Sequence, residues 1–298
     1  MKLSIVIVSW NTRDLLLECL TSVYATSMSD IEVWVVDNAS SDGTTDAVRQ
    51  RFADVNVIVN HENGGFARAN NQAIENCSGQ YILLLNPDTK VLGQALFQLV
   101  DHLDHHPECG ICGPMLLNPD NTLQESCYPF PTLAREFWRL SKLDHLHSYG
   151  IYPMKAWEID HPREVDVIQG AAFLVRKKCL DQIGLLDEDY FIYTEEVDLC
   201  YRAKKARWKI EWIPDAKVIH YGGQSTQQVA TKMFLMLYAT KVIFFRKHYG
   251  IFAAWIYKMI LLVCAIPRVI GKWLRPESEN QQKIAFNYSQ LIKKLSIM

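Results

Sequence analysis

Four apolar runs, separated by segments with helical spacing, occupy the first 85 residues and restrict the folds open to this chain. The runs are residues 4–9, 31–36, 55–59 and 81–85. The first is continuously apolar between its two serines, a pattern typical of a strand buried on both faces. Strands that alternate with helices at this rhythm predict an α/β fold with a doubly wound, mostly parallel sheet.

Polar side chains follow three of these runs. Trp10 and Asn11 come after the first run, Asp37 after the second, and Asn86 and Asp88 after the fourth. In open α/β sheets, ligands bind outside the carboxyl ends of the strands. These polar side chains can bind a ligand, and they occur where ligands bind in such sheets. Together they predict a ligand site at the carboxyl ends of the strands.

A cluster of acids lies much further along the chain. Glu195, Glu196 and Asp198 fall within about one helical turn, and His220 follows them. One interpretation is that the acids merely begin a helix, where they suit the positive end of the helix dipole. Together with Asp88 at a strand end, however, the acids and the histidine predict a metal-assisted transfer site with a nearby general base.

The charge of the chain is unevenly distributed. Residues 241–298 contain ten Lys or Arg and two acids, so they carry +8, although the whole chain carries −2. The first 240 residues therefore carry −10. An acidic body without a basic stripe is not the profile of a nucleic-acid-binding protein, so we expect no nucleic-acid partner.

Residues 118–165 differ from the α/β rhythm around them because they are rich in proline and aromatic residues. An excursion of this length in a compact domain is often a binding loop or a lid. A buried strand over residues 170–175 then returns the chain to the core. The acceptor of a transfer reaction is therefore expected at this excursion and at the loop around Gly170.

The C-terminal segment is helical in character, apolar and basic. Residues 231–248 predict one amphipathic helix, and residues 251–266 predict an apolar helix that ends at Pro267. These 16 residues fall short of the roughly 20 that span a bilayer. Packing on the main domain, or a dimer contact, is one interpretation. The other is a helix lying in the interface of an anionic leaflet, favoured by Arg246, Lys247, Trp255, Arg268, Lys272, Trp273 and Arg275.

The eight cysteines form no regular framework, which favours reduced thiols in a cytoplasmic protein. Cys109 and Cys112 form a C-x-x-C pair, but their apolar surroundings indicate a buried strand rather than a redox or zinc site. The N-terminal apolar run is short and ends in polar residues, so it predicts a first strand rather than a signal peptide.

Several segments occur in an order that matches a known family. They are residues 8–11, 36–44, 63–67 with 70–71, 85–88, 184–202 and 220–225. They resemble the family 2 inverting glycosyltransferases of GT-A fold, and within them the bacterial rhamnosyltransferase-like branch. The resemblance covers roughly residues 1–230 and implies a GT-A catalytic domain there. Residues 231–298 form the helical, membrane-associating extension that their apolar and basic composition predicts.

The resemblance also implies a nucleotide-diphosphate sugar as donor, with dTDP-rhamnose favoured and UDP-sugars left open. Asp37 would accept a hydrogen bond from the ring N–H of uracil or thymine. Asp88 and His220 would bind Mg²⁺ or Mn²⁺ bridging the two phosphates. Asn86 replaces the first acid of the family's D-x-D element, so metal binding could be weaker, or completed by phosphate oxygens and water. The implied donor contacts are Ser9, Trp10, Asn11, Asp37, Asn38, Asn63, Gly65, Phe66, Asn70 and Asn86.

The implied reaction is an in-line displacement that inverts the configuration of the sugar. Glu196 occupies the position of the general base, where the family usually has Asp, and Glu195 is the substitute. Glu196 would remove the proton from the acceptor hydroxyl, which attacks the anomeric carbon. The residues implied on the acceptor side are Gly170, Asp198 and Arg202. Arg202 is expected to pair with Asp198, four residues away along a helix.

The implied activity is transfer of a sugar to a glycan or lipid-linked acceptor in cell-surface polysaccharide synthesis. The enzyme would be cytoplasmic and peripheral on the inner face of the cell membrane. A non-catalytic nucleotide-sugar-binding scaffold is the alternative, and Asn86 and Glu196 favour it. A nucleotidyltransferase would need a Gly-rich basic loop after the first strand, and a Rossmann dehydrogenase a G-x-G-x-x-G there. Residues 9–14 contain neither.

Overall fold

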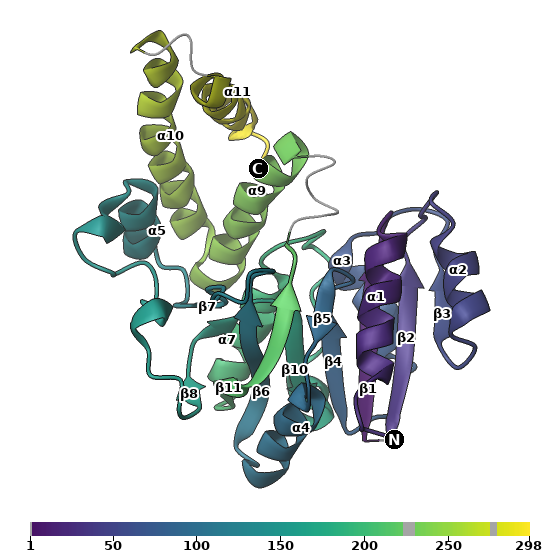
Figure 1. Cartoon of the computed structure of the whole chain (residues 1–298). Coiled ribbons are helices and arrows are strands. Elements are labelled where there is room, and N and C mark those ends of the chain that lie inside the picture. The colour runs from purple at the N-terminus through teal and green to yellow at the C-terminus, as the bar shows by residue number, and fades with distance from the viewer. Residues whose placement is uncertain (1, 223–229, 275–278) are drawn as a thin grey trace. The chain divides into compact units, whose positions relative to one another are not determined.

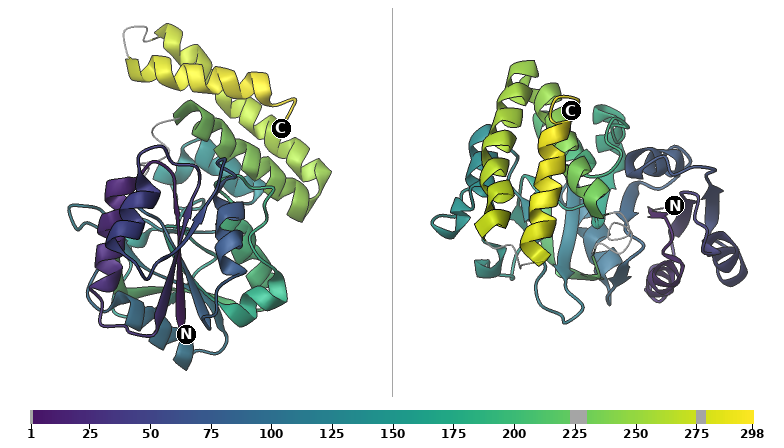
Figure 2. Two further views of the ribbon diagram at one scale, coloured as in Figure 1. Left: turned by 90° about the vertical axis from the view of Figure 1, so that its right-hand side faces the viewer. Right: turned by 90° about the horizontal axis from the view of Figure 1, so that it is seen from above.

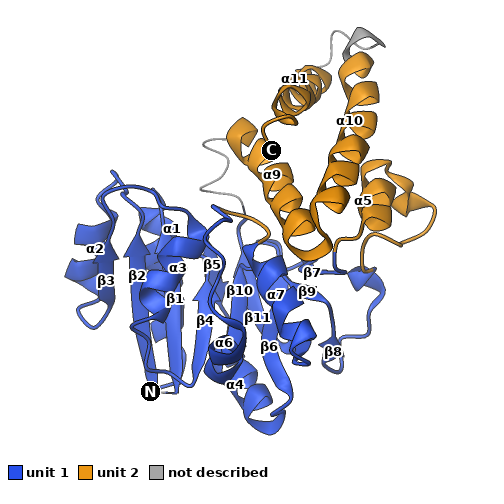
Figure 3. Ribbon diagram, turned by 180° about the vertical axis from the view of Figure 1, so that it is seen from behind, with its two compact units in different colours: residues 1–130, 153–191, 195–228 blue, residues 131–152, 192–194, 229–298 orange. Residues whose placement is uncertain are grey.

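The structure is a computed structural model that describes residues 2–222, 230–274 and 279–298. It contains two compact units (Figure 3). Unit 1 comprises residues 1–130, 153–191 and 195–228, and unit 2 comprises residues 131–152, 192–194 and 229–298. Residues 223–225 of the last motif and Arg275 lie outside the described residues, as do the side chains of Lys272 and Trp273.

Unit 1 is built on a mixed, mostly parallel sheet, as the sequence predicts (Figure 1). The strands are β1 (Leu3–Ser9), β2 (Ile31–Asp37), β3 (Asn56–Val59), β4 (Tyr81–Leu85), β5 (Thr89–Val91), β6 (Cys109–Leu117), β8 (Arg163–Glu164), β10 (Ala172–Arg176) and β11 (Lys209–His220). Their order is β3-β2-β1-β4-β10-β6-β11-β5, and β8 pairs with β11. β10 is antiparallel to β4 and β6, and β5 and β8 are antiparallel to β11. The other pairs are parallel.

Helices cover both faces of this sheet. α1 (Arg13–Tyr24) and α4 (Ala95–His105) lie on one face, and α3 (Phe66–Ile74) and α7 (Glu195–Lys205) lie on the other (Figures 1 and 3). The left view of Figure 2 shows α1 and α3 on opposite sides of the sheet. The chain also forms α2 (Thr44–Arg51), α6 (Lys177–Ile183) and a small second sheet of β7 (Cys127–Tyr128) and β9 (Val167–Ile168).

The composition of β1 explains its central place in the sheet. All seven of its residues are buried. Leu3, Ile5 and Ile7 belong to one cluster with residues of α1 and α4, and the residues between them face the other way because successive side chains of a strand alternate. Burying an aliphatic side chain of this size contributes about 1.5–3 kcal/mol. A strand that is apolar on both faces is therefore most stable between two other strands.

Unit 2 is a group of helices. α9 (Ala230–Tyr249), α10 (Ile251–Leu274) and α11 (Glu279–Lys294) share a hydrophobic core with α5 (Leu133–Leu140). Gly250 separates α9 from α10 with φ +89°, a left-handed conformation that glycine adopts without strain. Since α5 lies within residues 118–165, this proline-rich excursion is not wholly irregular.

The prediction that the apolar helix ends at Pro267 is wrong. α10 has 24 residues and contains Pro267 in its interior. The guanidinium group of Arg268 donates hydrogen bonds to the carbonyl oxygens of Cys264 and of Leu140 in α5. These contacts hold the helix where proline removes one backbone hydrogen bond. Over Ile251–Gly271, α10 is long and apolar enough to cross a membrane, and no other helix in the described ranges passes that test.

A buried ion pair lies inside unit 2. Lys241 donates to both carboxylate oxygens of Glu136 at 2.8 and 2.9 Å, and the hydroxyl of Tyr257 donates to the same carboxylate at 3.2 Å. Burial opposes ionisation of Glu136, but the nearby positive charges of Lys241 and Arg139 outweigh burial and lower its pKa. The inner side of α10, where Tyr257 lies, is therefore fixed to a charged group.

Candidate donor and catalytic site

The predicted site residues gather at one edge of the sheet in unit 1. Ser9, Asp37 and Leu85 are the last residues of β1, β2 and β4, and His220 is the last residue of β11. β10 is antiparallel to both β4 and β6, and β11 is parallel to β6. All four strands therefore end at the same edge (Figure 1). This is the edge at which ligands bind in open α/β sheets.

Asp37 is buried at the end of β2 and offers one carboxylate oxygen to a ligand. Its Oδ2 accepts a hydrogen bond from the backbone N–H of Ser40 at 3.1 Å. Its Oδ1 is also buried, but has no hydrogen-bond partner in the described part of the chain. A buried acceptor without a partner costs about 1–3 kcal/mol. An N–H donor on a ligand would remove this cost.

The turn after β1 shapes the same region. Asn11 adopts φ +51°, and its side-chain oxygen accepts a hydrogen bond from the backbone N–H of Ser41 at 2.8 Å. Ser9 is fully buried, and its hydroxyl lies 3.0 Å from that of Thr12. Trp10, between them, is partly exposed. Asn11 and Ser9 thus hold loops at this edge, and Trp10 and Asn11 are both partly exposed.

The start of α3 packs tightly against the chain at Phe191. Asn63 accepts a hydrogen bond from the backbone N–H of Gly65 at 3.0 Å. Gly65 has φ +89°, and a Cβ there would lie only 2.4 Å from the carbonyl oxygen of Phe191. The backbone N–H of Phe66 donates to the same oxygen at 2.6 Å. The glycine of this motif is therefore required by both its backbone angle and this close approach.

Two buried asparagines lie near this glycine. Asn38 donates to the carbonyl oxygen of Gly65 at 3.0 Å. Asn70 donates to the carbonyl oxygen of Phe66 at 2.8 Å, whereas its own side-chain oxygen is buried without a partner among the residues that the structure describes. Like Asp37, Asn70 therefore offers an unused acceptor.

Asp88 and His220 face each other across two strand ends. Nε2 of His220 lies 3.4 Å from Oδ1 of Asp88, and both side chains are buried. The backbone N–H of Tyr221 donates to the carbonyl oxygen of Asp88 at 2.9 Å, which fixes the two segments together. The structure thus brings together the two side chains that the resemblance assigns to a metal.

Gln124 determines which ring nitrogen of His220 carries the proton. The amide nitrogen of Gln124 donates to the backbone oxygen of His220 at 3.2 Å, so its amide oxygen faces Nδ1 at 2.7 Å. That oxygen can only accept, and Nδ1 is therefore the protonated nitrogen of the neutral ring. The lone pair of Nε2 is left facing the carboxylate of Asp88. A cation between these two groups would stabilise the arrangement.

Asn86 lies at the junction of β4 and β10. Its backbone N–H donates to the carbonyl oxygen of Ala171 at 2.9 Å, and its side chain is only partly buried. The residue before Ala171 is Gly170, which lies next to the acid cluster of α7. A Cβ on Gly170 would lie 3.7 Å from Cβ of Glu196. The strand end that carries Asn86 and the start of α7 therefore belong to one region.

The two glutamates at the start of α7 have different environments. Glu196 is partly exposed, whereas Glu195 is buried. Burial, and then the negative charge of Glu196, raise the pKa of Glu195 well above its usual value. Glu195 therefore favours its neutral form. The side chain of Glu196 is partly exposed, although its Oε2 is buried. The assignment of Glu196 as the base stays a prediction.

The backbone just before these glutamates is strained. Tyr193 and Thr194 have φ +70° and +72°. A β-branched residue such as threonine is a true outlier in the left-handed region. Strain of this kind costs about 1–3 kcal/mol per residue and accumulates at functional sites. Thr194 and Thr240 both belong to unit 2, and their hydroxyl groups lie 3.0 Å apart.

The predicted pairing of Arg202 with Asp198 is confirmed. Nε of Arg202 donates to Oδ2 of Asp198 at 2.7 Å, and Asp198 is fully buried. The guanidinium group also donates to the carbonyl oxygens of residues Ile183, Gly184 and Leu185. These contacts hold α7 to the turn after α6. They support a positioning role, and contact with an acceptor stays a prediction for both residues.

The eight cysteines all lie within the described residues, and all are buried free thiols. Burial raises the pKa of Cys109 and of Cys112, which suits their predicted place in a buried strand and not a reactive pair.

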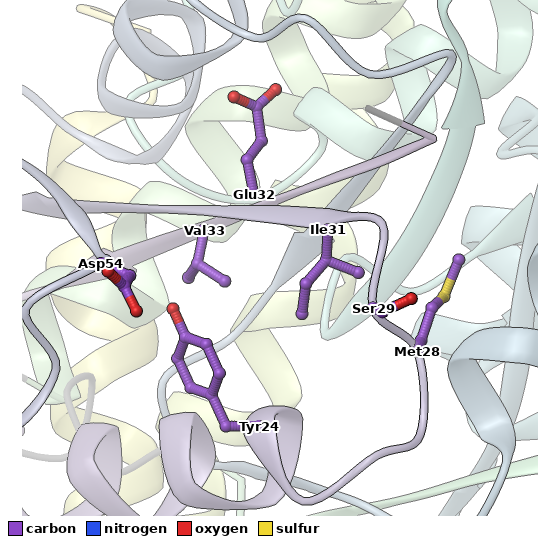
Figure 4. A pocket seen from close by; sticks show the side chains of 7 residues that line it. All are labelled: Tyr24, Met28, Ser29, Ile31, Glu32, Val33 and Asp54. Carbon is purple, nitrogen blue, oxygen red and sulfur yellow. The ribbon is translucent and has the colours of Figure 1, made fainter.

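A separate hollow of about 350 Å³ lies at the start of β2, whereas Asp37 lies at its end (Figure 4). None of the predicted site residues lines it. Its lining residues are Tyr24, Met28, Ser29, Ile31, Glu32, Val33 and Asp54.

Comparison with known proteins identifies the family to which the chain belongs. The model of the family described as Glycosyl transferase family 2 matches residues 4–154, half of the chain. The chain belongs to this family. The match spans β1 to β6 and therefore includes Asp37, the α3 turn and Asp88.

The relatives of this family 2 glycosyltransferase include enzymes of glycan synthesis. The N-acetylglucosaminyl-diphospho-decaprenol L-rhamnosyltransferase of Mycobacterium tuberculosis is 28% identical over 243 residues, which cover 75% of this chain and 77% of the relative. The low-salt glycan biosynthesis hexosyltransferase Agl10 of Haloferax volcanii is 27% identical over 225 residues, covering 73% of this chain and 66% of the relative. The predicted resemblance to rhamnosyltransferases is confirmed.

Solved glycosyltransferases share the fold. The mannosyltransferase PcManGT of Pyrobaculum calidifontis, solved with GDP-Man and Mn²⁺, superposes with a TM-score of 0.56 at 16% identity, covering 99% of this chain and 86% of that one. S. aureus TarS 1–349 in complex with UDP superposes with a TM-score of 0.55 at 14% identity, covering 100% and 92%. The predicted GT-A fold is confirmed, and the roles of individual residues stay predictions.

Sequence reasoning missed two groups in this site. Gln124 lies in the proline-rich excursion, outside all the motifs, and only the folded chain brings it to His220. The carbonyl oxygen of Phe191 is a backbone group, and such groups leave no signature in residue types. Its partner Gly65 was the available signal, because glycine in a motif often marks a close approach.

Proposed function

We propose that this family 2 glycosyltransferase transfers rhamnose from a nucleotide-diphosphate donor to a glycan or lipid-linked acceptor in cell-surface polysaccharide synthesis. The observation that carries the proposal is the buried Oδ1 of Asp37, which lacks a partner among the described residues at the ligand-binding edge. Uracil and thymine present a ring N–H that fits this acceptor. The name of the M. tuberculosis relative, an L-rhamnosyltransferase acting on a decaprenol-linked sugar, supports rhamnose and a lipid-linked acceptor. dTDP-rhamnose is the preferred donor.

Calorimetric binding tests this proposal. The full chain is titrated with dTDP-rhamnose, UDP-glucose and UDP-N-acetylglucosamine, each with Mn²⁺, with Mg²⁺ and with chelator. Asp37→Ala should weaken every pyrimidine donor, because it removes the acceptor, while Asp46→Ala on α2 serves as the matched control. Equal binding by Asp37→Ala and the unchanged chain would contradict the base contact, and tight binding of a UDP-sugar alone would contradict rhamnose.

The chemistry expected of this chain follows from the two glutamates. Glu196 accepts the proton of the acceptor hydroxyl, and the oxygen then attacks the anomeric carbon on the face opposite the diphosphate, so that the configuration inverts. Glu195 is buried and favours its neutral form, whereas the side chain of Glu196 is partly exposed. Gly170 has no side chain and leaves space beside Glu196 for the acceptor. Arg202 and Asp198 hold the helix that carries the base.

The residues at the other strand ends fit a divalent metal. His220, kept as the Nδ1–H tautomer by Gln124, points a lone pair at Asp88, and one nitrogen and one carboxylate are ligands that Mn²⁺ accepts. Asn86 supplies no negative charge, so phosphate oxygens and water would complete the shell, as Mg²⁺ and Mn²⁺ commonly require. Such an ion would neutralise charge on the departing diphosphate. The Mn²⁺ in the PcManGT structure supports this assignment.

The exposed face of α10 supports a location at the membrane surface. Tyr257, Leu261 and Cys264 pack inside unit 2, but the opposite face bears large apolar side chains in contact with solvent. From Phe252 onward these recur every three or four residues, and with the adjacent Ile251 they extend over about 28 Å of helix. They are Ile251, Phe252, Trp255, Met259, Val263, Ile266 and Ile270.

The lipid surface of the cytoplasmic leaflet is the occupant that this face fits. Arg246 and Lys247 precede α10 in the sequence and Lys258 lies within it, and these positive charges complement anionic head groups. A spanning orientation would bring the Glu136–Lys241 pair, which Tyr257 contacts, into the hydrocarbon, and buried membrane charges are costly. α10 would therefore lie in the membrane plane and keep the enzyme peripheral on the inner face.

Co-sedimentation with vesicles tests this location. Phe252 is 70% exposed on α10, and Phe97 is 54% exposed on α4, so the two residues form a matched pair. Phe252→Glu should reduce binding to vesicles that contain anionic lipid, and Phe97→Glu should not. Equal binding by both variants would contradict the surface, and concentration-dependent dimerisation lost in Phe252→Glu would assign the face to a second copy.

A non-catalytic scaffold is the second candidate, because Asn86 and Glu196 both depart from the pattern of the family. Donor binding without turnover in the presence of a decaprenol-linked acceptor and Mn²⁺ would favour it. NMR detection of an inverted glycosidic product would exclude it.

A further inference from the structure

A cluster of nitrogen and oxygen ligands lies in unit 1, away from the donor site. It consists of His102 in α4, His106 just after α4, and Glu211 in β11. One ligand atom from each residue lies within 4.8 Å of the other two. Glu211 stands near the start of β11, whereas His220 ends this strand. The cluster therefore belongs to the edge of the sheet opposite the donor site.

The cluster presents three candidate ligand atoms from two adjacent parts of the sheet and helix layer. His102 and His106 are four residues apart, so they share one helix face, and their rings stack with centroids 4.3 Å apart. Nε2 of His102 lies 2.6 Å from Oε2 of Glu211. The side chains of these two residues are only 9% and 13% exposed, while that of His106 is 46% exposed. The ligands are thus held inside, with access for an ion and water at His106.

The backbone that carries the ligands is fixed by a buried arginine. The guanidinium group of Arg176 donates to the carbonyl oxygens of Leu103, His106 and Cys109. The backbone N–H of His106 also continues the helical pattern by donating to the carbonyl oxygen of His102 at 3.0 Å. Such support reduces the entropy lost when an ion orders the side chains.

Glu211 and His102 already place two ligand atoms side by side. Nε2 of His102 and Oε2 of Glu211 form a hydrogen bond of 2.6 Å, and a metal ion would replace this direct contact by bonds to both atoms. For metal–ligand distances of about 2.0–2.1 Å, His102 and Glu211 must separate by less than about 1 Å, which side-chain rotation allows.

We propose that His102, His106 and Glu211 bind a divalent transition-metal ion of the Zn²⁺ class, which ties α4 to β11. Two imidazoles and one carboxylate are ligands typical of Zn²⁺, with water in the fourth position. Mg²⁺ prefers oxygen ligands and is not expected here. The ion is distinct from any ion at Asp88 and His220, and its role is to stabilise the fold and not to carry the chemistry.

Metal titration of the chelator-treated full chain tests this proposal. Zn²⁺ should bind with a stoichiometry of one at this site and raise Tm, and Co²⁺ should give the visible absorption of four-coordinate cobalt. His106→Ala is the safest variant because the side chain is half exposed. It should weaken Zn²⁺ binding by more than about 100-fold, because loss of a ligand should exceed the roughly 10–100-fold loss typical of an outer-shell change. His102→Ala and Glu211→Gln should act in the same way.

Matched controls separate this site from adventitious binding. His105→Ala alters the same helix, but this ring is 71% exposed and bonded to the carbonyl oxygen of Asp101, so Zn²⁺ affinity should not change. His220→Ala and His161→Ala remove the donor-site histidine and the exposed group of Glu158, Asp160 and His161. Zn²⁺ binding that survives in His106→Ala, or that is lost in any of the three controls instead, would overturn the proposal.

Discussion

Replacing Gln124 by leucine would test whether His220 is held ready to bind a metal. The substitution keeps the size of the side chain but removes both of its hydrogen bonds to His220, one to the ring and one to the backbone. Nδ1 then loses the acceptor that keeps it protonated. The ring can change tautomer and donate from Nε2 to Asp88, 3.4 Å away. The metal would have to compete with this new hydrogen bond.

The magnitude follows from the loss of one outer-shell hydrogen bond at a ligand. Such changes weaken metal affinity by about 10–100-fold, which corresponds to about 1.4–2.8 kcal/mol. Gln124→Glu is the matched control, because its carboxylate can still accept from Nδ1. It loses the amide donor to the backbone oxygen of His220 and to the side-chain oxygen of Asn118, as Gln124→Leu also does, but keeps the acceptor for Nδ1. Metal affinity should therefore stay near that of the unchanged chain.

The assay is donor binding measured by calorimetry at increasing Mn²⁺ concentrations. In Gln124→Leu the Mn²⁺ concentration for half-maximal donor affinity should rise at least tenfold, while donor binding in chelator stays unchanged. A rise of less than about twofold would refute the reasoning, because it would lie below the smallest expected effect. A parallel loss of binding in chelator would show instead that the substitution has damaged the whole pocket.

Three further substitutions probe other parts of the site. Glu196→Gln should lower the transfer rate about 10²–10⁴-fold with donor affinity kept, as expected for a lost base, and loss of donor affinity in calorimetry would contradict this role. Gly65→Ala should destabilise the fold by more than the 1–3 kcal/mol typical of backbone strain alone, because its Cβ meets Phe191, whereas Gly43→Ala has φ +78° but open space around it. Urea unfolding of both variants measures the difference, and equal losses would exclude the close contact. Because the folded-state pKa of Glu195 is raised, its stabilising protonated form is lost as pH rises through that value. Between about pH 4 and pH 8, the free energy of unfolding of Glu195→Gln should therefore fall less than that of the unchanged chain. The difference should be about 1.4 kcal/mol for each pH unit between the unfolded and folded pKa values, and identical pH profiles in urea unfolding would contradict the assignment.

The sheet could be predicted from the sequence because its strands are apolar runs with abrupt polar ends. The predicted strand at 81–85 agrees with β4 at both ends, and the polar residues at the carboxyl ends of β1, β2 and β4 do lie at one edge. The pairing of Arg202 with Asp198 was also predictable, since it depends only on helical spacing. These features are local, so neighbouring residues contain all the necessary information.

The features that could not be predicted depend on distant contacts. Pro267 normally ends a helix, but Arg268 bonds to Leu140 in another helix and keeps the chain helical. Gln124 meets His220 across 96 residues, and the contact has no signature in residue spacing. Burial in the folded chain likewise raises the pKa of Glu195 and favours its neutral form. The sequence shows only three acids close together and does not show which of them is buried.

The unpartnered oxygen of Asp37 has a consequence for which nucleotides can occupy the site. Cytosine places a lone pair where uracil and thymine place an N–H, so a cytidine donor would set two acceptors against each other in a buried place. Sites that depend on a substrate N–H or O–H reject analogues lacking it by about 10⁴–10⁵-fold. The carboxylate of Asp37 would thus select donors by their base, favouring uridine and thymidine nucleotides over cytidine nucleotides whatever sugar they carry.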